Sequence, residues 1–323
     1  MQKEKLMRDT FIDEIYKAIK GGNKDIYFFN ADLGANALDR FRDDPQTKTR
    51  FVTTGISEQN AVNLCTGIAL RGKIPYVYAM APFLFARPLE QIKIASATNA
   101  PINIVGVGVG YSYEGDGPTH YATEDVACIR ALPNVEIITP CDTNSVIQTA
   151  IMSYKTPGIR YIRLDRRYLP DIYNQNETSF IKDGIVEIDK GKDICIFATG
   201  VMVHTAKKVK QILSDKNINI GIVDVYRINP FNVKKFVEIA NNYSQLITLE
   251  EHFRSGGLGE LTAGILSIKN ITKPLEILAI DGENQVVGGQ YRIEGWVNRS
   301  DLHKLLELDA ESVASKVELL KYK

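Results

Sequence analysis

Short runs of β-branched and aromatic residues alternate with longer amphipathic stretches along most of the chain. Such runs favour strands, and helical stretches between them are typical of βαβ units, whose strands form a parallel sheet. The pattern predicts strands over 26–30, 51–54, 75–79, 102–108 and 135–139, and an edge strand over 159–164. It predicts helices over 8–20, with apolar residues at helical spacing, and over 58–71. The expected fold class is therefore α/β.

A polar, turn-rich segment interrupts this pattern after the first half of the chain. We expect it to be a linker over 173–190, between a first domain at 1–172 and a second at 191–323. The second domain shows the same alternation, with strands expected over 193–200, 218–225 and 246–250, helices over 203–213 and 233–240, and a further helix beginning at the glycine-rich turn 255–259. The prediction is two open α/β domains, the first with a mainly parallel sheet.

Composition excludes several classes of partner. The chain has 39 basic and 39 acidic residues and no basic stripe, so nucleic acid is not an expected partner. No apolar run approaches the ~20 residues of a membrane helix, so no membrane partner is expected. The four cysteines are widely spaced and predict neither a zinc site nor a disulfide framework, which favours a reduced, cytoplasmic location: Cys65, Cys128, Cys141 and Cys195.

Several chemically useful side chains fall where predicted strands end. Ligands of open α/β sheets bind beyond the carboxyl ends of the strands. The side chains in or beside such loops are Asp32, Glu58, Phe83, Phe85, Asp116 and His120. A site is expected to be assembled there.

Glu58 has two interpretations. At the start of a helix, its carboxylate could complete a capping box with Ser57 or interact with the helix dipole. Alternatively, a semi-buried carboxylate with few counter-charges nearby could hydrogen-bond a heterocycle and shift its protonation. Sequence spacing leaves both open.

Asp116 and His120 lie four residues apart in one Gly/Pro loop. A lone histidine in such a loop can simply hydrogen-bond the loop, but an acid and an imidazole together can bind polyol hydroxyls and transfer protons. Phe83 and Phe85 are core residues by default, and form a stacking surface only for a flat ligand. Gly115-Asp116-Gly117 with the later Asn144 imitates a motif that holds magnesium and diphosphate, but the residues after it differ, so no metal ligand is predicted in this chain.

Four motifs together resemble the transketolase family: Ala31-Asp32-Leu33, Gly55 to Asn60, Asp116 to His120 with Glu124-Asp125 after it, and Asp165 to Pro170. The similarity is to the C-terminal half of that thiamine-diphosphate enzyme, a pyrimidine-binding domain followed by the transketolase C-terminal domain. It runs from about Arg8 to the last helices.

The resemblance implies roles for individual residues. Glu58 matches the glutamate that hydrogen-bonds N1′ of the aminopyrimidine and so promotes deprotonation of the thiazolium carbon. Phe85, or Phe83 with a small alignment shift, matches the ring that stacks on the pyrimidine. The other matches are Asp32 and Leu33 to cofactor contacts, His120 and Asp116 to sugar contacts, Arg166 and Arg8 to phosphate-binding arginines, and Asn36 to a phosphate-contacting serine.

The departures from the family pattern are informative too. The diphosphate-binding half is missing, so the resemblance implies that the chain is one subunit of a split transketolase. It also implies a separate partner subunit that supplies the main ligands of Mg²⁺ and diphosphate, and self-association of the two chains into a heterotetramer. A substrate-side histidine of the family falls near Gly108, and the loop 110–114 differs from the common version. These changes put the usual pentose phosphates in doubt as substrates.

Two other functions remain open. The chain could belong to a related enzyme that uses 2-oxo acids, such as a deoxyxylulose-phosphate synthase-like or 2-oxoacid dehydrogenase β-type subunit. It could also be a non-catalytic structural subunit. The Asp-Gly-Pro-Thr-His form of residues 116–120 favours the sugar-using branch, and the joint presence of the glutamate, aromatic, aspartate and histidine argues against a purely structural role.

Overall fold

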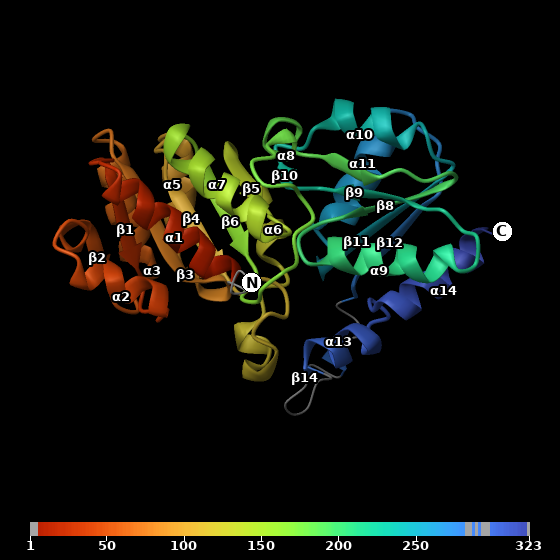
Figure 1. Ribbon diagram of the computed structural model, residues 1–323, viewed down its shortest axis with the longest axis horizontal. Coiled ribbons are helices and arrows are strands. Elements are labelled where there is room, and N and C mark those ends of the chain that lie inside the picture. The colour runs from red at the N-terminus through yellow and green to blue at the C-terminus, as the bar shows by residue number, and fades with distance from the viewer. Residues whose placement is uncertain (1–5, 282–285, 288–289, 292–297, 322–323) are drawn as a thin grey trace.

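The computed structural model describes residues 6–281, 286–287, 290–291 and 298–321. Two α/β sheets lie side by side along the long axis of the molecule (Figure 1). The first has seven strands in the order β10-β5-β6-β4-β3-β1-β2, and the second has five in the order β12-β11-β8-β9-β7. A short hairpin joins β13 (Val286–Val287) and β14 (Gln290–Tyr291). The predicted pair of open α/β domains is confirmed.

The first sheet is parallel except at one edge. Its parallel strands are β1 (Ile26–Asn30), β2 (Phe51–Thr53), β3 (Ile74–Met80), β4 (Asn103–Val107), β5 (Val135–Ile138) and β6 (Ile159–Leu164). At the edge, β10 (Arg227–Asn229) comes from the second half of the sequence and pairs antiparallel with β5.

The expectation of an edge strand over 159–164 is wrong. β6 lies between β4 and β5, and all six of its residues are buried. Its charged positions do not mark a solvent-facing side, because buried Arg160 pairs with partly buried Glu136 and buried Arg163 pairs with buried Asp125. Alternating charge indicates an exposed face only when no buried partner is available.

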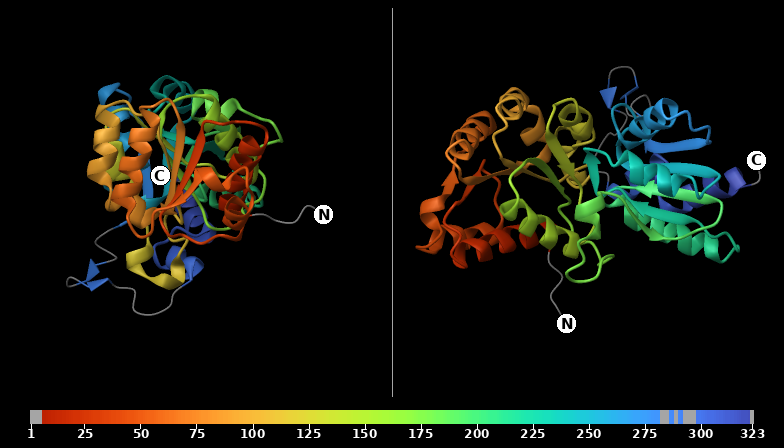
Figure 2. Two further views of the ribbon diagram at one scale, coloured as in Figure 1. Left: turned by 90° about the vertical axis from the view of Figure 1, so that its left-hand side faces the viewer. Right: turned by 90° about the horizontal axis from the view of Figure 1, so that it is seen from above.

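Helices cover both faces of the first sheet, as Figure 2 shows. One layer contains α1 (Met7–Lys20), α2 (Asn36–Asp43) and α7 (Thr143–Lys155). The other contains α3 (Glu58–Ala69), α4 (Ala81–Ala86), α5 (Leu89–Ala97) and α6 (Asp125–Arg130). Three short 3₁₀ helices complete the domain: η1 (Lys48–Arg50), η2 (Glu114–Asp116) and η3 (Pro118–His120). Because both faces are covered, the strands are buried on both sides and mostly apolar.

The second domain has the same layered plan. Its strands are β7 (Val186–Asp189), β8 (Ile194–Ala198), β9 (Gly221–Asp224), β11 (Gln245–Phe253) and β12 (Leu275–Ile280). Helices α9 (Met202–Ser214) and α14 (Ala310–Lys321) pack with α13 (Arg299–Leu305) around one core, and α10 (Val233–Ala240) and α11 (Leu258–Ile268) pack around the other.

The polar segment 173–190 is structured. It contains α8 (Ser179–Asp183) and β7, which pairs antiparallel with β9 at the edge of the second sheet. Turn-rich composition therefore did not reveal the edge strand. Across the part of the chain that the structure describes, no helix is both long enough and apolar enough to span a bilayer.

Candidate active site

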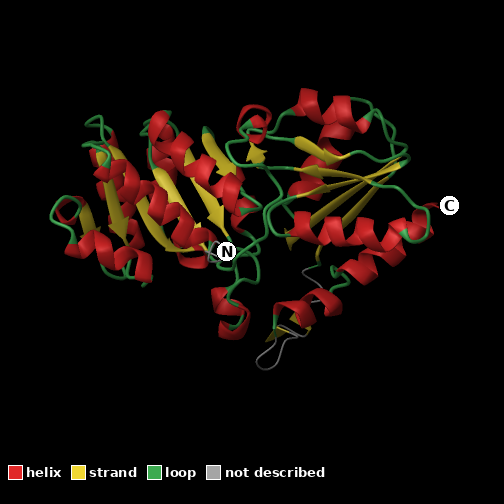
Figure 3. Cartoon of the chain, viewed as in Figure 1, coloured by secondary structure: helices red, strands yellow, loops and turns green. Residues whose placement is uncertain are grey.

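The predicted site residues follow neighbouring strands of the first sheet. Asp32 and Leu33 follow β1, Glu58 begins α3 after β2, and Phe83 and Phe85 lie in α4 after β3. Asp116 and His120 lie in η2 and η3 after β4, and Arg166 follows β6. These strands are parallel, so their carboxyl ends meet at one edge of the sheet, toward which the arrowheads point in Figure 3. The fold thus brings residues separated by over a hundred positions to a common edge.

Glu58 is a buried carboxylate with a cationic partner. Its side chain is 4% exposed, and Arg87 Nη1 donates to Glu58 Oε1 at 2.7 Å. The capping box is not formed, because no side chain caps α3 and the Ser57 hydroxyl donates to the carbonyl of Thr54. The expected scarcity of counter-charges is also wrong, since Arg87 supplies one. Within the residues that the structure describes, Glu58 Oε2 accepts no hydrogen bond.

Phe83 joins Glu58 to the histidine loop. The guanidinium carbon of Arg87 lies 4.1 Å from the centroid of the Phe83 ring, a cation–π distance. The Phe83 ring also packs edge-on against the His120 ring, with the two ring centroids 5.3 Å apart. Phe85 is 3% exposed and belongs to the hydrophobic core. Of the two candidate aromatics, Phe83 is the one in contact with His120.

Glu58, Arg87, Phe83 and His120 thus form a row of contacting side chains. Tyr113 extends this row, and its place there was not predicted from the sequence. Its ring lies 6.3 Å from His120, and the guanidinium carbon of Arg166 lies 4.8 Å from its centroid. Burial raises the pKa of Tyr113, while the nearby Arg166 and Arg8 oppose this by favouring the phenolate. Arg8 and Arg166, far apart in the sequence, therefore converge on one side chain.

Gly108 explains how Tyr113 reaches this place. Its φ is +85°, a left-handed conformation that favours glycine, and a Cβ there would lie 1.9 Å from Tyr113 Cε2. The Tyr113 ring thus occupies the space that a side chain at 108 would need. A glycine in a strand-end loop followed by an aromatic five residues later was the only sequence signal for this arrangement.

The remaining predicted residues are more peripheral. Asp116 is exposed and acts on Tyr113 through its charge. Asp32, with φ of +58°, and Asn36, the first residue of α2, are exposed. Among the described residues, no hydrogen bond or ion pair joins Asp32 or Asn36 to the row from Glu58 to Tyr113. Leu33 donates its backbone N–H to Asn30 Oδ1 at 3.2 Å and packs against the core.

The second domain braces the loop that carries His120. Glu251 accepts hydrogen bonds from the backbone N–H of Tyr111 at 3.0 Å and from Arg299 Nε at 2.7 Å. Arg299 Nη1 also donates to Asp165 Oδ2 at 2.7 Å, and Glu114 accepts from the Arg299 backbone. Of the three 3₁₀ helices, η2 and η3 accordingly lie beside α13, as the yellow and blue segments show in Figure 1 and in the left view of Figure 2. Arg299 and His303 hold the pKa of Glu251 well below its usual range despite burial.

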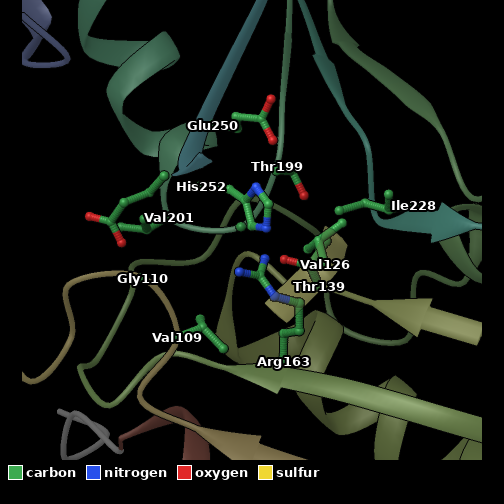
Figure 4. A pocket seen from close by; sticks show the side chains of 12 residues that line it. Val109, Gly110, Val126, Thr139, Arg163, Thr199, Val201, Ile228, Glu250 and His252 are labelled. Atoms are coloured by element: carbon green, nitrogen blue, oxygen red, sulfur yellow. The ribbon is translucent and has the colours of Figure 1, made fainter. Parts of the chain in front are cut away.

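A second buried cluster lies between the domains around a cavity of about 20 Å³. Figure 4 shows the Arg163 guanidinium and the His252 ring pointing toward one another there. Arg163 donates to both oxygens of Asp125, at 2.8 and 3.0 Å. Burial lowers the pKa of His252 to about 4 and raises that of Glu250 to about 7. Since the space holds about one water molecule, this cluster joins the domains and is not a substrate site.

No cluster of three or more histidine, cysteine, aspartate or glutamate side chains that could hold a metal occurs in the described ranges. The Asn144 amide, the last part of the apparent magnesium motif, donates to the carbonyl of Tyr173 at 2.7 Å. Asp142 caps α7 beside it. These polar groups therefore serve the start of a helix.

Comparison with known proteins gives a consistent result. A family model for the transketolase pyrimidine-binding domain matches residues 6–171, and one for the transketolase C-terminal domain matches residues 184–281. One subunit of the apulose-4-phosphate transketolase of Phocaeicola vulgatus is 32% identical over 288 residues, covering 88% of this chain and 91% of that protein. The putative transketolase C-terminal section of Methanocaldococcus jannaschii is 32% identical over 274 residues, covering 83% and 82%.

A solved structure resembles the whole chain. It is a split-gene transketolase described as an inactive β4 tetramer, and it matches with a TM-score of 0.79 and 25% identity over 98% of both chains. Both domain matches, the two relatives and this structure agree on the family and on the order of the two domains. The chain therefore belongs to the transketolase family, of which it contains the pyrimidine-binding and C-terminal domains.

Proposed function

We propose that this chain is the pyrimidine-side subunit of a two-chain, thiamine-diphosphate-dependent transketolase that moves a two-carbon ketol unit from a ketose phosphate to an aldose. The observation that supports this most is the continuous row Glu58–Arg87–Phe83–His120–Tyr113 at one sheet edge. It combines a buried carboxylate, an aromatic ring and an imidazole, which are kinds of group that such chemistry can use.

The residues present fit the aminopyrimidine end of the cofactor. Glu58 Oε1 is fixed by Arg87, and Oε2 accepts no hydrogen bond from the described part of the chain, so Oε2 is available to hold a proton shared with a ring nitrogen. Phe83 supplies an aromatic surface next to that carboxylate. When bound, thiamine diphosphate would supply the carbon nucleophile that carries the two-carbon unit.

His120 and the groups around Tyr113 suit the sugar. His120 lies beside Phe83, where its imidazole can exchange a proton with a sugar hydroxyl, and exposed Asp116 can accept a hydrogen bond from another hydroxyl. Arg166 and Arg8 converge on Tyr113, and two guanidinium groups at one place favour a phosphate. The proposed order along the edge is cofactor ring, reacting carbons and then substrate phosphate.

A partner subunit would complete the site. One relative is named as a single subunit of its transketolase and another as a C-terminal section, which supports a separate chain that binds the diphosphate and Mg²⁺. The split-gene structure is described as an inactive β4 tetramer, which supports self-association and inactivity of such chains on their own. We propose a heterotetramer with two copies of each of the two chains.

Reconstitution tests this function. The chain is mixed with its diphosphate-binding partner, thiamine diphosphate and Mg²⁺, and assayed with apulose 4-phosphate, with linear ketose phosphates and with pyruvate as donors. We expect activity only in the mixture and only with ketose phosphates. Glu58→Gln should lower kcat by about 100-fold or more, because the amide cannot hold the shared proton.

Glu90→Gln is the matched control, since Glu90 lies exposed on α5. It should leave kcat unchanged. Wild-type turnover in the Glu58→Gln complex would refute the role of Glu58, and turnover with pyruvate would favour the 2-oxo-acid branch of the family. Absence of thiamine diphosphate binding in the complex would favour a structural subunit.

A further inference from the structure

The loop over residues 111–121, called the His120 loop below, is closed at its base. Gly110 and Ala122 form an antiparallel bridge there, with N–H to carbonyl distances of 2.9 and 3.0 Å. Within the loop, the backbone hydrogen bonds are local, and the His120 N–H, for example, donates to the carbonyl of Gly117 at 2.9 Å. Such turns shape the loop but do not fix its direction, which depends on what holds the two stems at the base.

Strand β11 of the second domain holds both stems. On one stem, Glu251 Oε2 accepts the backbone N–H of Tyr111 at 3.0 Å. On the other stem, the backbone N–H of Phe253 donates to the carbonyl of Thr123 at 2.7 Å. Glu251 and Phe253 lie two residues apart at the end of the same strand. The end of β11 therefore fixes both sides of the loop base.

Gly110 leaves room for the Glu251 carboxylate. The φ of Gly110 is +57°, and a Cβ there would lie 1.8 Å from Glu251 Oε2. Any larger residue at 110 would therefore push the carboxylate away from the Tyr111 N–H. Because the Glu251 side chain is only 4% exposed, this hydrogen bond is shielded from water and is stronger than an exposed one.

Arg299, at the start of α13, connects Glu251 to the segment that carries Arg166. Arg299 Nη1 donates to Asp165 Oδ2 at 2.7 Å. Asp165 Oδ1 in turn accepts the backbone N–H of Arg167 at 2.8 Å, which closes a bend over 165–167. This bend, called the Arg166 bend below, follows β6 and places Arg166 beside the His120 loop.

Glu114 ties the outer part of the His120 loop to the same arginine. One oxygen of its carboxylate accepts the backbone N–H of Arg299, and the other pairs with the Arg167 guanidinium. Its own carbonyl accepts from the Tyr121 hydroxyl at 3.1 Å. Arg299 thus holds the stem of the loop through Glu251, the Arg166 bend through Asp165 and the outer part of the loop through Glu114.

The cofactor end of the proposed site is held from within the first domain. Glu58 begins α3 and pairs with Arg87, which follows α4 and lies over the Phe83 ring. Among the described residues, no hydrogen bond or ion pair joins this group to Glu251 or Arg299. Phe83 meets the His120 loop through its ring edge. Loosening the loop would therefore remove one ring contact and leave the Glu58–Arg87 pair intact.

We propose that Glu251 and Arg299 are positioning residues, through which the second domain orients the His120 loop and the Arg166 bend and so controls sugar-phosphate binding separately from cofactor binding. This inference rests on the proposed function, in which His120 faces the sugar and Arg166 its phosphate. The Glu251 and Arg299 side chains are 4% and 3% exposed, so they act through the loop and the bend and not by touching a ligand. Displacement of a contact group by about 1 Å can lower a rate about 100-fold.

Two affinities measured on the reconstituted complex test the proposal. Glu251→Gln removes the charge that pairs with Arg299, and should raise the KM for the ketose phosphate about tenfold while the Kd for thiamine diphosphate stays within about twofold of wild type. Glu114→Ala is a milder variant, because Glu114 is partly exposed and its loss should not prevent folding. It should raise the donor KM about fivefold. Glu114→Gln keeps an acceptor for the Arg299 N–H and should recover part of that loss.

Tyr173→Phe is the matched control for a weakened domain junction. The Tyr173 hydroxyl donates to Asp224 Oδ2 at 2.6 Å, a contact made on β9 and not on β11. Its removal should lower the melting temperature but leave the donor KM within about twofold of wild type. The positioning role is overturned if Tyr173→Phe raises the donor KM as much as Glu251→Gln does.

Hydrogen exchange on the full chain supplies a readout that needs no activity. In Glu251→Gln the amides of residues 111–122 should exchange faster, while those of α3 keep their wild-type rates. Unchanged donor KM in active Glu251→Gln and Glu114→Ala complexes, or an equal weakening of thiamine diphosphate binding, would overturn the proposal. A wild-type complex without turnover would instead refute the proposed function, and the exchange rates would then decide whether the second domain holds the loop.

Discussion

Replacement of Arg299 by methionine should strongly destabilise the junction between the two domains. Arg299 is 3% exposed and donates to Glu251 from Nε at 2.7 Å and to Asp165 from Nη1 at 2.7 Å. Arg299→Met keeps much of the aliphatic volume but leaves two buried carboxylates without this cation. Removing one partner of a buried ion pair costs about 3–5 kcal/mol. With an unfolding entropy of about 2.1 cal/mol/K per residue over 323 residues, the melting temperature should fall by roughly 4–7 °C.

The pH dependence of this loss provides a second test. Arg299 and His303 lower the pKa of Glu251, so the stability from this contact is present above the ordinary glutamate pKa of about 4.3 and is lost as pH falls through the lower folded value. The difference between wild type and Arg299→Met should therefore be large at about pH 7.5 and clearly smaller near about pH 3.

Urea denaturation at the two pH values, followed by circular dichroism, measures these differences. Arg166→Met is the matched control, because Arg166 is exposed and its loss should change the free energy of unfolding by less than about 0.5 kcal/mol. A loss below about 1 kcal/mol in Arg299→Met, or an equal loss at both pH values, would refute the reasoning.

Three further outcomes follow from single contacts. Burial raises the pKa of Asp224 to about 7, so wild-type stability relative to Asp224→Asn should be highest below the unfolded pKa of about 3.9 and fall by a few kcal/mol up to about pH 7, as urea denaturation against pH would show. Gly108→Ala forces a Cβ into the Tyr113 ring, and should destabilise the chain by more than about 1 kcal/mol and raise KM in the reconstituted enzyme; unchanged KM and melting temperature would contradict this. Arg87→Met releases the Glu58 carboxylate and should lower kcat by about 10- to 100-fold, whereas Arg71→Met, at an exposed position, should not; equal rates for both would count against the positioning role.

The spacing of apolar residues predicted most helices and strands correctly, because each element has its own short-range repeat of buried positions. The strand at 26–30 and the helix at 233–240 have the expected bounds, and α1 buries the predicted positions Phe11, Ile12 and Ile15. The placement of β6 could not be predicted, because its charged residues pair with Glu136 and Asp125 from other segments. Nor could β10 be assigned to the first sheet, since its partner strand lies some ninety residues earlier.

The candidate site shows the same division. Strand-end position was sufficient to select Glu58, Phe83 and His120 as a group, because parallel strands end at one edge. Two members of the row, Arg87 and Tyr113, were not predicted, because neither belongs to a sequence motif that marks it. Each joins the row only through a contact that forms on folding.

Residue order by itself determined the α/β class, the two domains and the resemblance to the transketolase family, and it predicted the edge of the sheet at which we propose the site. These properties depend on short-range periodicity and on motifs that survive without coordinates. Tertiary structure decided which charges are paired, which of Phe83 and Phe85 meets His120, and how Arg8 and Arg166 converge on Tyr113. Those outcomes depend on contacts between distant segments, whose energies arise only when packing removes the side chains from water.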